Sequence, residues 1–174
     1  MCSSDLLAIR HGDGEAHGLH ITRLCPEERF PVCSPVLLHG GRENLTAAEI
    51  ARMPLLHLND RQDWMTWFQA AGYTGTVPAR GPVLNQDNMV IDAAVDGHGV
   101  ALARTTLAAH DLVTGRLVRP SALALGVPYA YWIVCPQTVA SIPKIVTFRD
   151  WLLAEAERDT LALRQSKTEP DFES

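Results

Sequence analysis

The sequence predicts an α/β chain with largely parallel sheets, arranged as two lobes. Short apolar runs that are typical of strands alternate with segments of helical periodicity. Proline-marked crossing segments near Cys33 and Pro128 divide the chain. Its 174 residues, 47% hydrophobic and 20% charged, suit one sizeable domain or two small ones. We expect lobe one at 5–35 and 127–158, lobe two at 36–126, and a disordered polar tail at 159–174.

The elements of the first lobe come from both ends of the chain. "DLLAIR", at 5–10, predicts a buried strand, and a buried strand needs neighbours that the few preceding residues cannot supply. "LHITRL", at 19–24, alternates apolar and polar residues like a strand. "FPVCSPVLL", at 30–38, holds two prolines and predicts a crossing segment rather than a regular element. A strand at 128–136 and a helix from 143 to about 158 complete this lobe.

The second lobe begins with a helix start signal. Thr46 followed three residues later by Glu49 forms a capping-box pattern. "DWMTWFQAAG" predicts a helix, because its large aromatic side chains recur at helical spacing and Gly72 follows its end. The remaining elements are expected as strands at 54–58, 81–85, 100–103 and 115–120, with helices at about 87–95 and 106–112.

The stretch "NQDNMVIDAAVDGHGVALAR" carries the clearest local signal for a binding site. Gly97 and Gly99 predict a sharp turn from a helix into a closely packed strand. The polar residues before the helix would lie at its N-terminus, where unpaired N–H groups favour an acceptor or anion. Ligands of open α/β sheets bind beyond the carboxyl ends of the strands, which is where this turn is expected. The alternative is that Asn85 or Asp87 merely caps the helix.

Composition excludes several classes of protein. The formal charge of −5 disfavours nucleic-acid binding by this chain, because phosphate contacts require clustered Lys and Arg. No run approaches the roughly 20 apolar residues of a membrane span, and the start does not resemble a signal peptide. The four cysteines have no CxxC spacing, so we expect reduced, buried thiols and a cytoplasmic location.

Five segments in order resemble the effector-binding domain of LysR-type transcriptional regulators, in the branch named for the glycine-cleavage activator. The resemblance runs from about residue 5 to 157. The segments are "DLLAIRHGDG", "FPVCSPVLL", "DWMTWFQAAG", "AAVDGHGVALARTTLAAHDLVTGRLVRP" and "YAYWIVCP…FRDWLLAE".

The resemblance implies a two-lobed periplasmic-binding-protein-like fold of type 2, with a small-molecule cleft between the lobes. Family members begin with a winged helix-turn-helix and a linker helix, and then a strand, a helix and a strand of lobe one. None of these precedes "DLLAIR" here, so lobe one is expected to be incomplete and the chain truncated. The implied partners are a small polar metabolite of the amino acid or organic acid class, further copies of the parent chain, and DNA only through the absent helix-turn-helix. No cofactor is implied.

Positions carried over from the family place effector contacts at three sites along the chain. An amide-rich, partly charged set with one aromatic wall suits a small polar ligand. Each position also has an ordinary structural interpretation: Trp64 as a core residue, His11 as a surface residue, and Arg61 in a local ion pair with its aspartate neighbours. The expected effector-binding residues are His11, Asp60, Arg61, Asp63, Trp64, Asn85, Gln86 and Asn88.

Catalytic and metal sites have weaker support, and we expect no enzyme. The sequence "HGDGEAHGLH" places three histidines near two carboxylates, but no HExxH or CxxC accompanies them. Ser34 lies outside any GxSxG elbow, and no phosphate-loop motif is present. Two alternatives to a regulator's sensing domain remain on the same scaffold: a free-standing solute-binding protein, and a small-molecule enzyme such as a dehydratase.

Overall fold

A computed structural model describes residues 7–38 and 44–165 of the chain. The chain divides into two compact units, and each is described by itself. The first unit combines Met1–Glu27 with Val127–Ser174, and the second is the continuous segment Glu28–Gly126.

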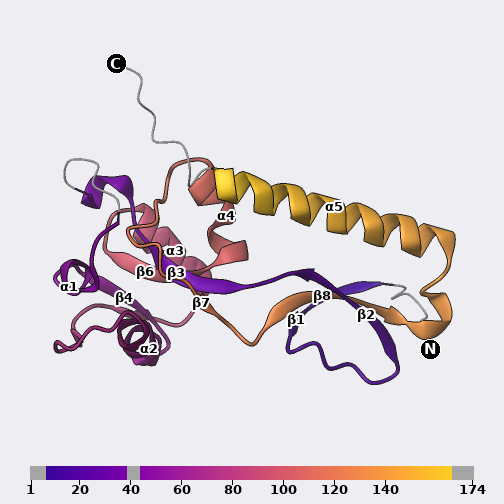
Figure 1. Ribbon diagram of the computed structural model, residues 1–174, viewed down its shortest axis with the longest axis horizontal. Coiled ribbons are helices and arrows are strands. Elements are labelled where there is room, and N and C mark those ends of the chain that lie inside the picture. The colour runs from indigo at the N-terminus through magenta and orange to yellow at the C-terminus, as the bar shows by residue number, and fades with distance from the viewer. Residues whose placement is uncertain (1–6, 39–43, 166–174) are drawn as a thin grey trace, which may run out of the picture. The chain divides into compact units, whose positions relative to one another are not determined.

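The second unit is built on a mixed five-stranded sheet of order β5-β4-β6-β3-β7. Strands β4, β5 and β6 are parallel to one another, whereas β3 is antiparallel to both β6 and β7 (Figure 1). Its strands are β3 (Glu28–Val32), β4 (Leu55–Leu58), β5 (Val83–Leu84), β6 (Val100–Arg104) and β7 (Leu125–Gly126). Its helices are η1 (Pro35–Leu37), α1 (Ala47–Ile50), α2 (Gln62–Ala70), α3 (Asp87–Val95) and α4 (Thr105–Val113).

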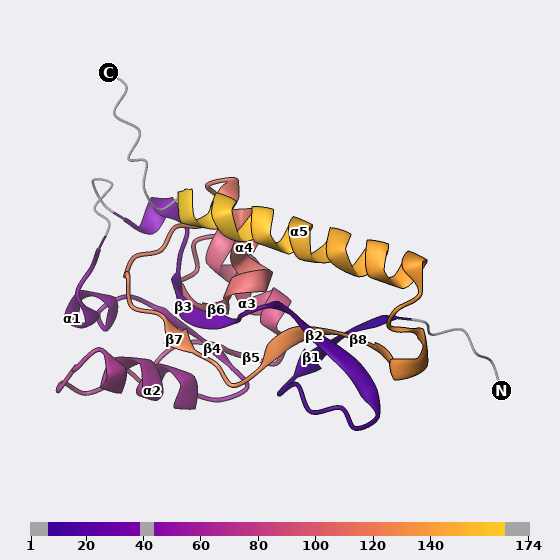
Figure 2. The ribbon, with the colours of Figure 1, turned by 45° about the vertical axis from the view of Figure 1, so that its right-hand side comes forward.

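Alternating side chains of this sheet fill two separate hydrophobic cores. Val100 packs with α1 and α2 on one face, while its neighbour Ala101 packs with α3 and α4 on the other. Leu55 and Leu56 of β4 divide between the same two cores. The pairs of helices accordingly lie on opposite faces of the sheet (Figure 2). Successive side chains of a strand point to opposite faces of the sheet. A strand that helices cover on both faces therefore needs consecutive apolar residues, and the run "VALA" of β6 supplies them.

Helix ends follow the signals in the sequence. Thr46 and Glu49 form the predicted capping box at α1. Gly72 and Gly97 follow α2 and α3 with φ of 67° and 77°, a conformation that glycine adopts without a steric penalty. Gly99 passes so close to β4 that an added Cβ would lie 2.6 Å from the Pro54 carbonyl oxygen. The tight turn from α3 into β6 therefore depends on glycine, as predicted.

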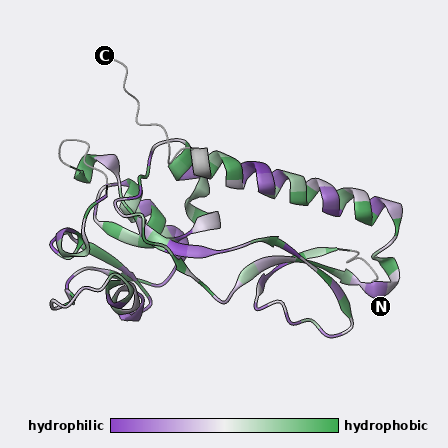
Figure 3. Cartoon of the chain, in the orientation of Figure 1, coloured by the Kyte–Doolittle hydropathy of each residue, from purple (hydrophilic) through white to green (hydrophobic). Residues whose placement is uncertain are grey.

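The first unit holds a smaller, wholly antiparallel sheet of order β1-β8-β2. Helix α5 lies along this sheet and contacts β2. Hydrophilic and hydrophobic residues alternate along α5 (Figure 3), and Ile145 is buried whereas Phe148 and Trp151 are 47% and 51% exposed. The elements are β1 (Ala8–Gly12), β2 (Leu19–Cys25), β8 (Ala130–Pro136), η3 (Gln137–Val139) and α5 (Pro143–Gln165).

Three expectations for the first unit are corrected. Strand β1 begins at Ala8 and lies at the sheet edge, where Ala8 to His11 are exposed rather than buried. The sheet is antiparallel, not parallel. Helix α5 continues to Gln165 instead of ending near 158, because "DTLALR" consists mostly of good helix formers. Residues 159–165 of the expected tail therefore belong to α5, and residues 166–174 lie outside the described residues, as do the first residues of "DLLAIR".

Two expectations near the prolines are also corrected. The segment 28–35, assigned to lobe one, begins with β3, a strand of the second unit's sheet. Pro31 is tolerated within this strand because β7 pairs only with Glu28 and Arg29, so no neighbour on that side needs a donor from Pro31. The predicted strand at 115–120 reduces to a single bridge between Val118 and Cys33.

The described cysteines include two buried thiols, as expected. Cys33 and Cys135 are both buried and free of disulfides. Burial raises the pKa of the Cys33 thiol to about 12, so this group stays protonated at neutral pH. Cys2 lies outside the described residues. Within 7–38 and 44–165, we find no helix with the length and hydrophobicity that crossing a bilayer requires.

Candidate functional site

The carboxyl ends of three parallel strands meet at one edge of the second unit's sheet. Strands β4, β5 and β6 end at Leu58, Leu84 and Arg104, and helices α2, α3 and α4 begin within four residues of these ends. Antiparallel β3 begins at the same edge, since Arg29 is the register partner of Arg104. We call this set of strand ends and helix starts the polar edge; it comprises residues 28–29, 59–63, 85–88 and 104–105.

Short hydrogen bonds hold the segments of the polar edge together. The Asn59 amide donates to the Leu84 carbonyl oxygen over 2.7 Å, which joins the ends of β4 and β5. The Thr105 hydroxyl oxygen accepts from the Glu28 amide at 3.1 Å, which joins the start of α4 to β3. The edge is therefore a connected structure rather than a set of independent loops.

Two ion pairs cross the polar edge. The Arg104 guanidinium donates to both carboxylate oxygens of Asp87. Nη2 lies 2.9 Å from Oδ2, and Nε lies 3.3 Å from Oδ1. Arg29 forms a second ion pair with Asp63 in the first turn of α2. Each pair fastens a helix start to a neighbouring strand, and both aspartates lie where the helix dipole favours negative charge. Asp63, expected to contact an effector, is thus engaged by Arg29.

The amide side chains of the polar edge are accessible. Asn85, Gln86 and Asn88 are exposed, and their side chains make no hydrogen bond with other described residues. Gln86 occupies the N-cap position of α3 without a side-chain cap, and Asp87 is committed to Arg104. The alternative in which Asn85 or Asp87 only caps the helix is therefore wrong. Three amides, each with donors and an acceptor, face solvent at one corner.

The turn before α2 and the first turns of α2 hold the remaining predicted site residues, Asp60, Arg61 and Trp64, in three different settings. Asp60 is exposed, and its Oδ1 accepts from the Gln62 amide at 2.8 Å, so it caps α2. The Arg61 Nε donates to the Ala79 carbonyl oxygen at 2.7 Å instead of pairing with its aspartate neighbours. Trp64 is only 1% exposed, and its indole Nε1 donates to the Leu56 carbonyl oxygen at 2.8 Å. Trp64 thus supports the edge from the core, and its ring is not an accessible wall.

His11 belongs to the first unit and is exposed on edge strand β1. Its ring lies 4.9 Å from that of Tyr131, its partner in register, and 5.9 Å from that of Tyr129. The exposed His11 ring therefore lies beside two aromatic rings of its own unit. Its sequence neighbours alone did not indicate these contacts.

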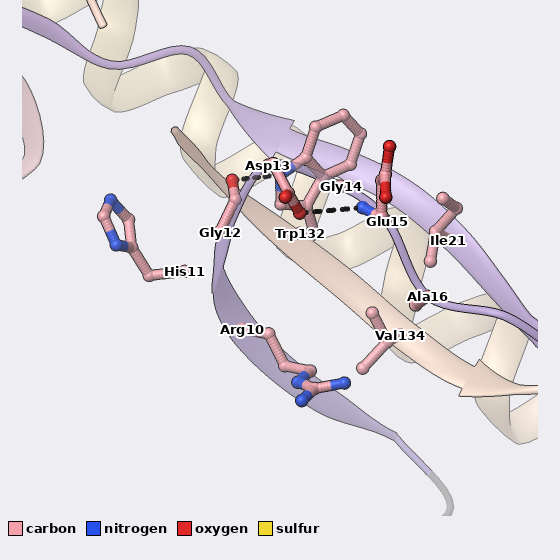
Figure 4. A pocket seen from close by; sticks show the side chains of 10 residues that line it. All are labelled: Arg10, His11, Gly12, Asp13, Gly14, Glu15, Ala16, Ile21, Trp132 and Val134. Carbon is pink, nitrogen blue, oxygen red and sulfur yellow. Dashed lines mark hydrogen bonds between the residues drawn. The ribbon is translucent and has the colours of Figure 1, made fainter. Parts of the chain in front are cut away.

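A small pocket lies in the first unit beside His11, where the turn after β1 folds over Trp132 (Figure 4). Its volume is about 120 Å³. The Trp132 indole donates to the Gly12 carbonyl oxygen at 2.9 Å, and Gly14, with φ of 90°, packs directly against the indole ring. Arg10, Asp13 and Glu15 bring charge of both signs to its lining, while the His11 ring points away from them.

Sequence reasoning included Arg61 but missed two other cations of the polar edge, Arg29 and Arg104. Arg29 and Arg104 each flank a buried strand, and a charged residue at the carboxyl end of an apolar run such as "VALAR" was the available signal. The pocket at Trp132 had no such signal, because Trp132 meets the turn through pairing between β1 and β8, 120 residues apart. Among the residues that the structure describes, no three His, Cys, Asp or Glu side chains gather as metal ligands do.

Comparison with known proteins identifies the family. The model of the LysR substrate binding domain matches residues 7–157. The glycine cleavage system transcriptional activator of Escherichia coli strain K12 is 38% identical over 150 residues, which are 86% of this chain and 49% of that protein. The transcriptional activator AmpR of Citrobacter freundii is 33% identical over 83% of this chain and 48% of its own length. The chain thus spans about half the length of the curated relatives it matches.

Solved structures agree with this assignment. The effector binding domain of AmpR from Citrobacter freundii superimposes with a TM-score of 0.67 at 29% identity, covering 88% of this chain and 75% of that one. The effector domain of AmpR from Pseudomonas aeruginosa gives a TM-score of 0.62 at 30% identity, covering 88% and 72%. The expected α/β class is confirmed, as a mixed α/β fold with two sheets, and the relatives are regulators rather than enzymes. The chain belongs to the LysR substrate-binding domain family.

Proposed function

We propose that this chain is the effector-sensing part of a LysR-type transcriptional regulator and that the polar edge of its second unit contacts a small polar metabolite. The observation that carries the proposal is the corner of exposed amides at Asn85, Gln86 and Asn88, beyond the carboxyl ends of parallel strands. Family membership supports an effector-binding role, and the position of the corner supports these residues as contacts.

The chemistry of the edge favours a metabolite of the amino acid or organic acid class. Primary amides donate to carboxylate or carbonyl oxygens and accept from ammonium or hydroxyl groups, so they suit a small ligand with both kinds of group. The exposed Asp60 and Arg61 lie on the neighbouring loop of the polar edge, which the Asn59–Leu84 hydrogen bond joins to the end of β5, and they add one charge of each sign. His11 of the first unit is also a proposed effector-binding residue, and its ring lies 4.9 Å from that of Tyr131.

The role of the whole regulator follows as a proposal from the relatives. Effector binding would change transcription by favouring one of two states of the regulator, and the coupling equals the difference in effector affinity between those states. Homo-oligomers of the parent protein, acting on DNA through a separate domain in the cytoplasm, are the proposed setting.

A thermal-shift screen of amino acids and organic acids tests the binding proposal. A bound compound at a hundred times its Kd should stabilise the folded chain by about 2.7 kcal/mol, and the shift should grow with concentration. We expect the paired change Asn85→Ala and Asn88→Ala to abolish the shift. Gln69→Ala is the matched control, because it removes an exposed amide near the C-terminal end of α2, and the polar edge lies at the N-terminal end of that helix.

Calorimetry with any compound found then measures the loss directly. We expect at least about tenfold weaker binding in the doubly substituted protein, which corresponds to about 1.4 kcal/mol, and unchanged binding in Gln69→Ala. Equal affinity in the double variant and the parent chain would refute the placement of the site at the amide corner.

A further inference from the structure

The segment 79–82 contacts β4 at three points and the N-cap residue of α2 at a fourth. The Arg61 Nε donates to the Ala79 carbonyl oxygen at 2.7 Å, and the His57 ring Nε2 lies 3.2 Å from the Arg80 carbonyl oxygen. The His57 backbone amide donates to the Pro82 carbonyl oxygen at 3.0 Å. Gly81, with φ of 127°, approaches β4 so closely that an added Cβ would lie 1.9 Å from the Leu55 carbonyl oxygen.

The contact with Arg80 fixes the tautomer of His57. A carbonyl oxygen only accepts hydrogen bonds, so Nε2 must carry the proton that is donated to it. The other nitrogen, Nδ1, is buried and has no hydrogen-bond partner among the described residues. His57 as a whole is 1% exposed. The neutral ring therefore fits this environment: its Nε2–H donates to Arg80, and its unprotonated Nδ1 is buried.

The fastened segment leads directly into the amide corner. Residues 79–82 continue into β5, which has only two residues, Val83 and Leu84, and then into Asn85. His57 and Val83 are register partners in the β4–β5 ladder. A strand of two residues has little pairing of its own to hold its position, so the contacts of His57 help to place the corner, together with the Asn59–Leu84 hydrogen bond and the Arg104–Asp87 ion pair.

We propose that neutral His57 is a positioning residue that locks segment 79–84 onto β4, and that protonation of its Nδ1 releases the segment. The consequence for effector binding rests on the proposed function, since it assumes that Asn85 and Gln86 contact the effector. The lock itself does not depend on that assumption. Acidification would then weaken the presentation of the amide corner.

Burial and a nearby charge oppose the protonation of His57. Packed against it are segment 79–82, which carries Arg80, and the start of α2, which carries Arg61 together with Asp60 and the Arg29-paired Asp63. Of these charges, that of Arg61 opposes protonation of His57. Burial, with a smaller contribution from the Arg61 charge, lowers the pKa of His57 below its ordinary value of 6.5, against the effect of the Arg80 carbonyl. The unfolded chain therefore binds the proton first, and the folded segment loses stability as the pH falls below about 6.5.

Nuclear magnetic resonance of the full chain tests the lock without an effector. The ¹⁵N shifts of the imidazole nitrogens should show a protonated Nε2 and a bare Nδ1 for His57 near pH 7.5, and a midpoint of titration below the ordinary histidine value of 6.5. Amide hydrogen exchange should show a loss of protection at the amides of His57 and Asn59, which donate to the Pro82 and Leu84 carbonyl oxygens, between about pH 7.5 and about pH 5.5, relative to β6.

Two variants separate the lock from general destabilisation. His57→Gln keeps a donor for the Arg80 carbonyl oxygen but has no proton to gain, so the protection of its amides at positions 57 and 59 should be independent of pH. His98→Gln should behave like the parent chain, because His98 is exposed in the turn between α3 and β6.

Three results would overturn the proposal. One is a bare Nε2 on His57, another is a titration midpoint of His57 at or above its ordinary value of 6.5, and the third is an equal loss of protection in His57→Gln. The imidazole measurement decides the matter even if His57→Gln fails to fold. A failure of effector binding at the amide corner would leave all of these measurements unchanged, so the two proposals fail separately.

Discussion

The two units bury their sheets to different extents. The second unit covers both faces of its sheet with helices and fills two cores, so that Val32, Val100 and Ala101 are fully buried. The first unit buries its central strand β8, yet leaves Ile9 of edge strand β1 50% exposed and Ile21 of β2 37% exposed. A precise arrangement of polar side chains needs a rigid support, and the second unit supplies it.

The difference also concerns how polar groups are held. At the polar edge, Arg29 and Arg104 are joined to helix starts, and Trp64 anchors α2 from below. In the first unit, the pocket depends on a turn that rests on one ring, that of Trp132. We therefore expect substitutions in the two cores of the second unit to disturb the site more than comparable substitutions in the first unit.

The largest effect is expected for Trp64→Ala. The ring is 1% exposed, packs edge-on against Trp67 at 5.7 Å between centroids, and donates a buried hydrogen bond to Leu56. Its removal leaves a large cavity and an unsatisfied carbonyl, so we expect a loss of about 3–5 kcal/mol in the free energy of unfolding. Urea denaturation followed by tryptophan fluorescence and circular dichroism measures it.

Met65→Ala is the control, because Met65 is the next residue of α2 and is 51% exposed. We expect its effect to stay within about 0.5 kcal/mol. Similar losses in both variants would show that α2 is not anchored through Trp64, and the contrast between the units would lose its main support.

Periodicity predicted most of the second unit because its elements are locally determined. "DWMTWFQAAG" and "VALAR" bury the side chains that their spacing assigns to the core. Thr46 and Glu49 form their cap within a single turn. Local rules were sufficient wherever each segment carries its own start, stop and buried face.

Pairing between distant segments was what the sequence did not reveal. The exposure of β1 depends on which strands lie beside it, and the place of Pro31 inside β3 depends on the short reach of β7. The ion pair between Arg104 and Asp87 joins the end of β6 to the start of α3, and Arg29 meets Asp63 across 34 positions of sequence. The amides were predicted from their place before a helix, whereas the residues that hold that helix required the fold.

A second prediction compares two isoleucines on neighbouring strands of the first unit. Ile133 and Ile9 are partners in register, so they share one face of the sheet, yet Ile133 is 2% exposed and Ile9 is 50% exposed. We expect Ile133→Ala to lower the free energy of unfolding by about 2–4 kcal/mol and Ile9→Ala by less than about 1 kcal/mol. Urea denaturation of both variants measures the difference, and equal losses would show that β1 is as buried as β8.

The smallest effect is expected from the ion pair that fastens α3. Arg104 and Asp87 are 18% and 33% exposed, so solvent screens their attraction only in part. A double-mutant cycle with Arg104→Ala and Asp87→Ala isolates the pair from the other contacts of each residue, and we expect a coupling free energy of about 1 kcal/mol. The coupling should shrink as salt is raised from about 0.05 M to about 1 M, because the Debye length falls several-fold over this range. A coupling near zero at low salt would mean that the start of α3 is held by its hydrophobic face alone, and Arg104 would then have no part in placing the amide corner.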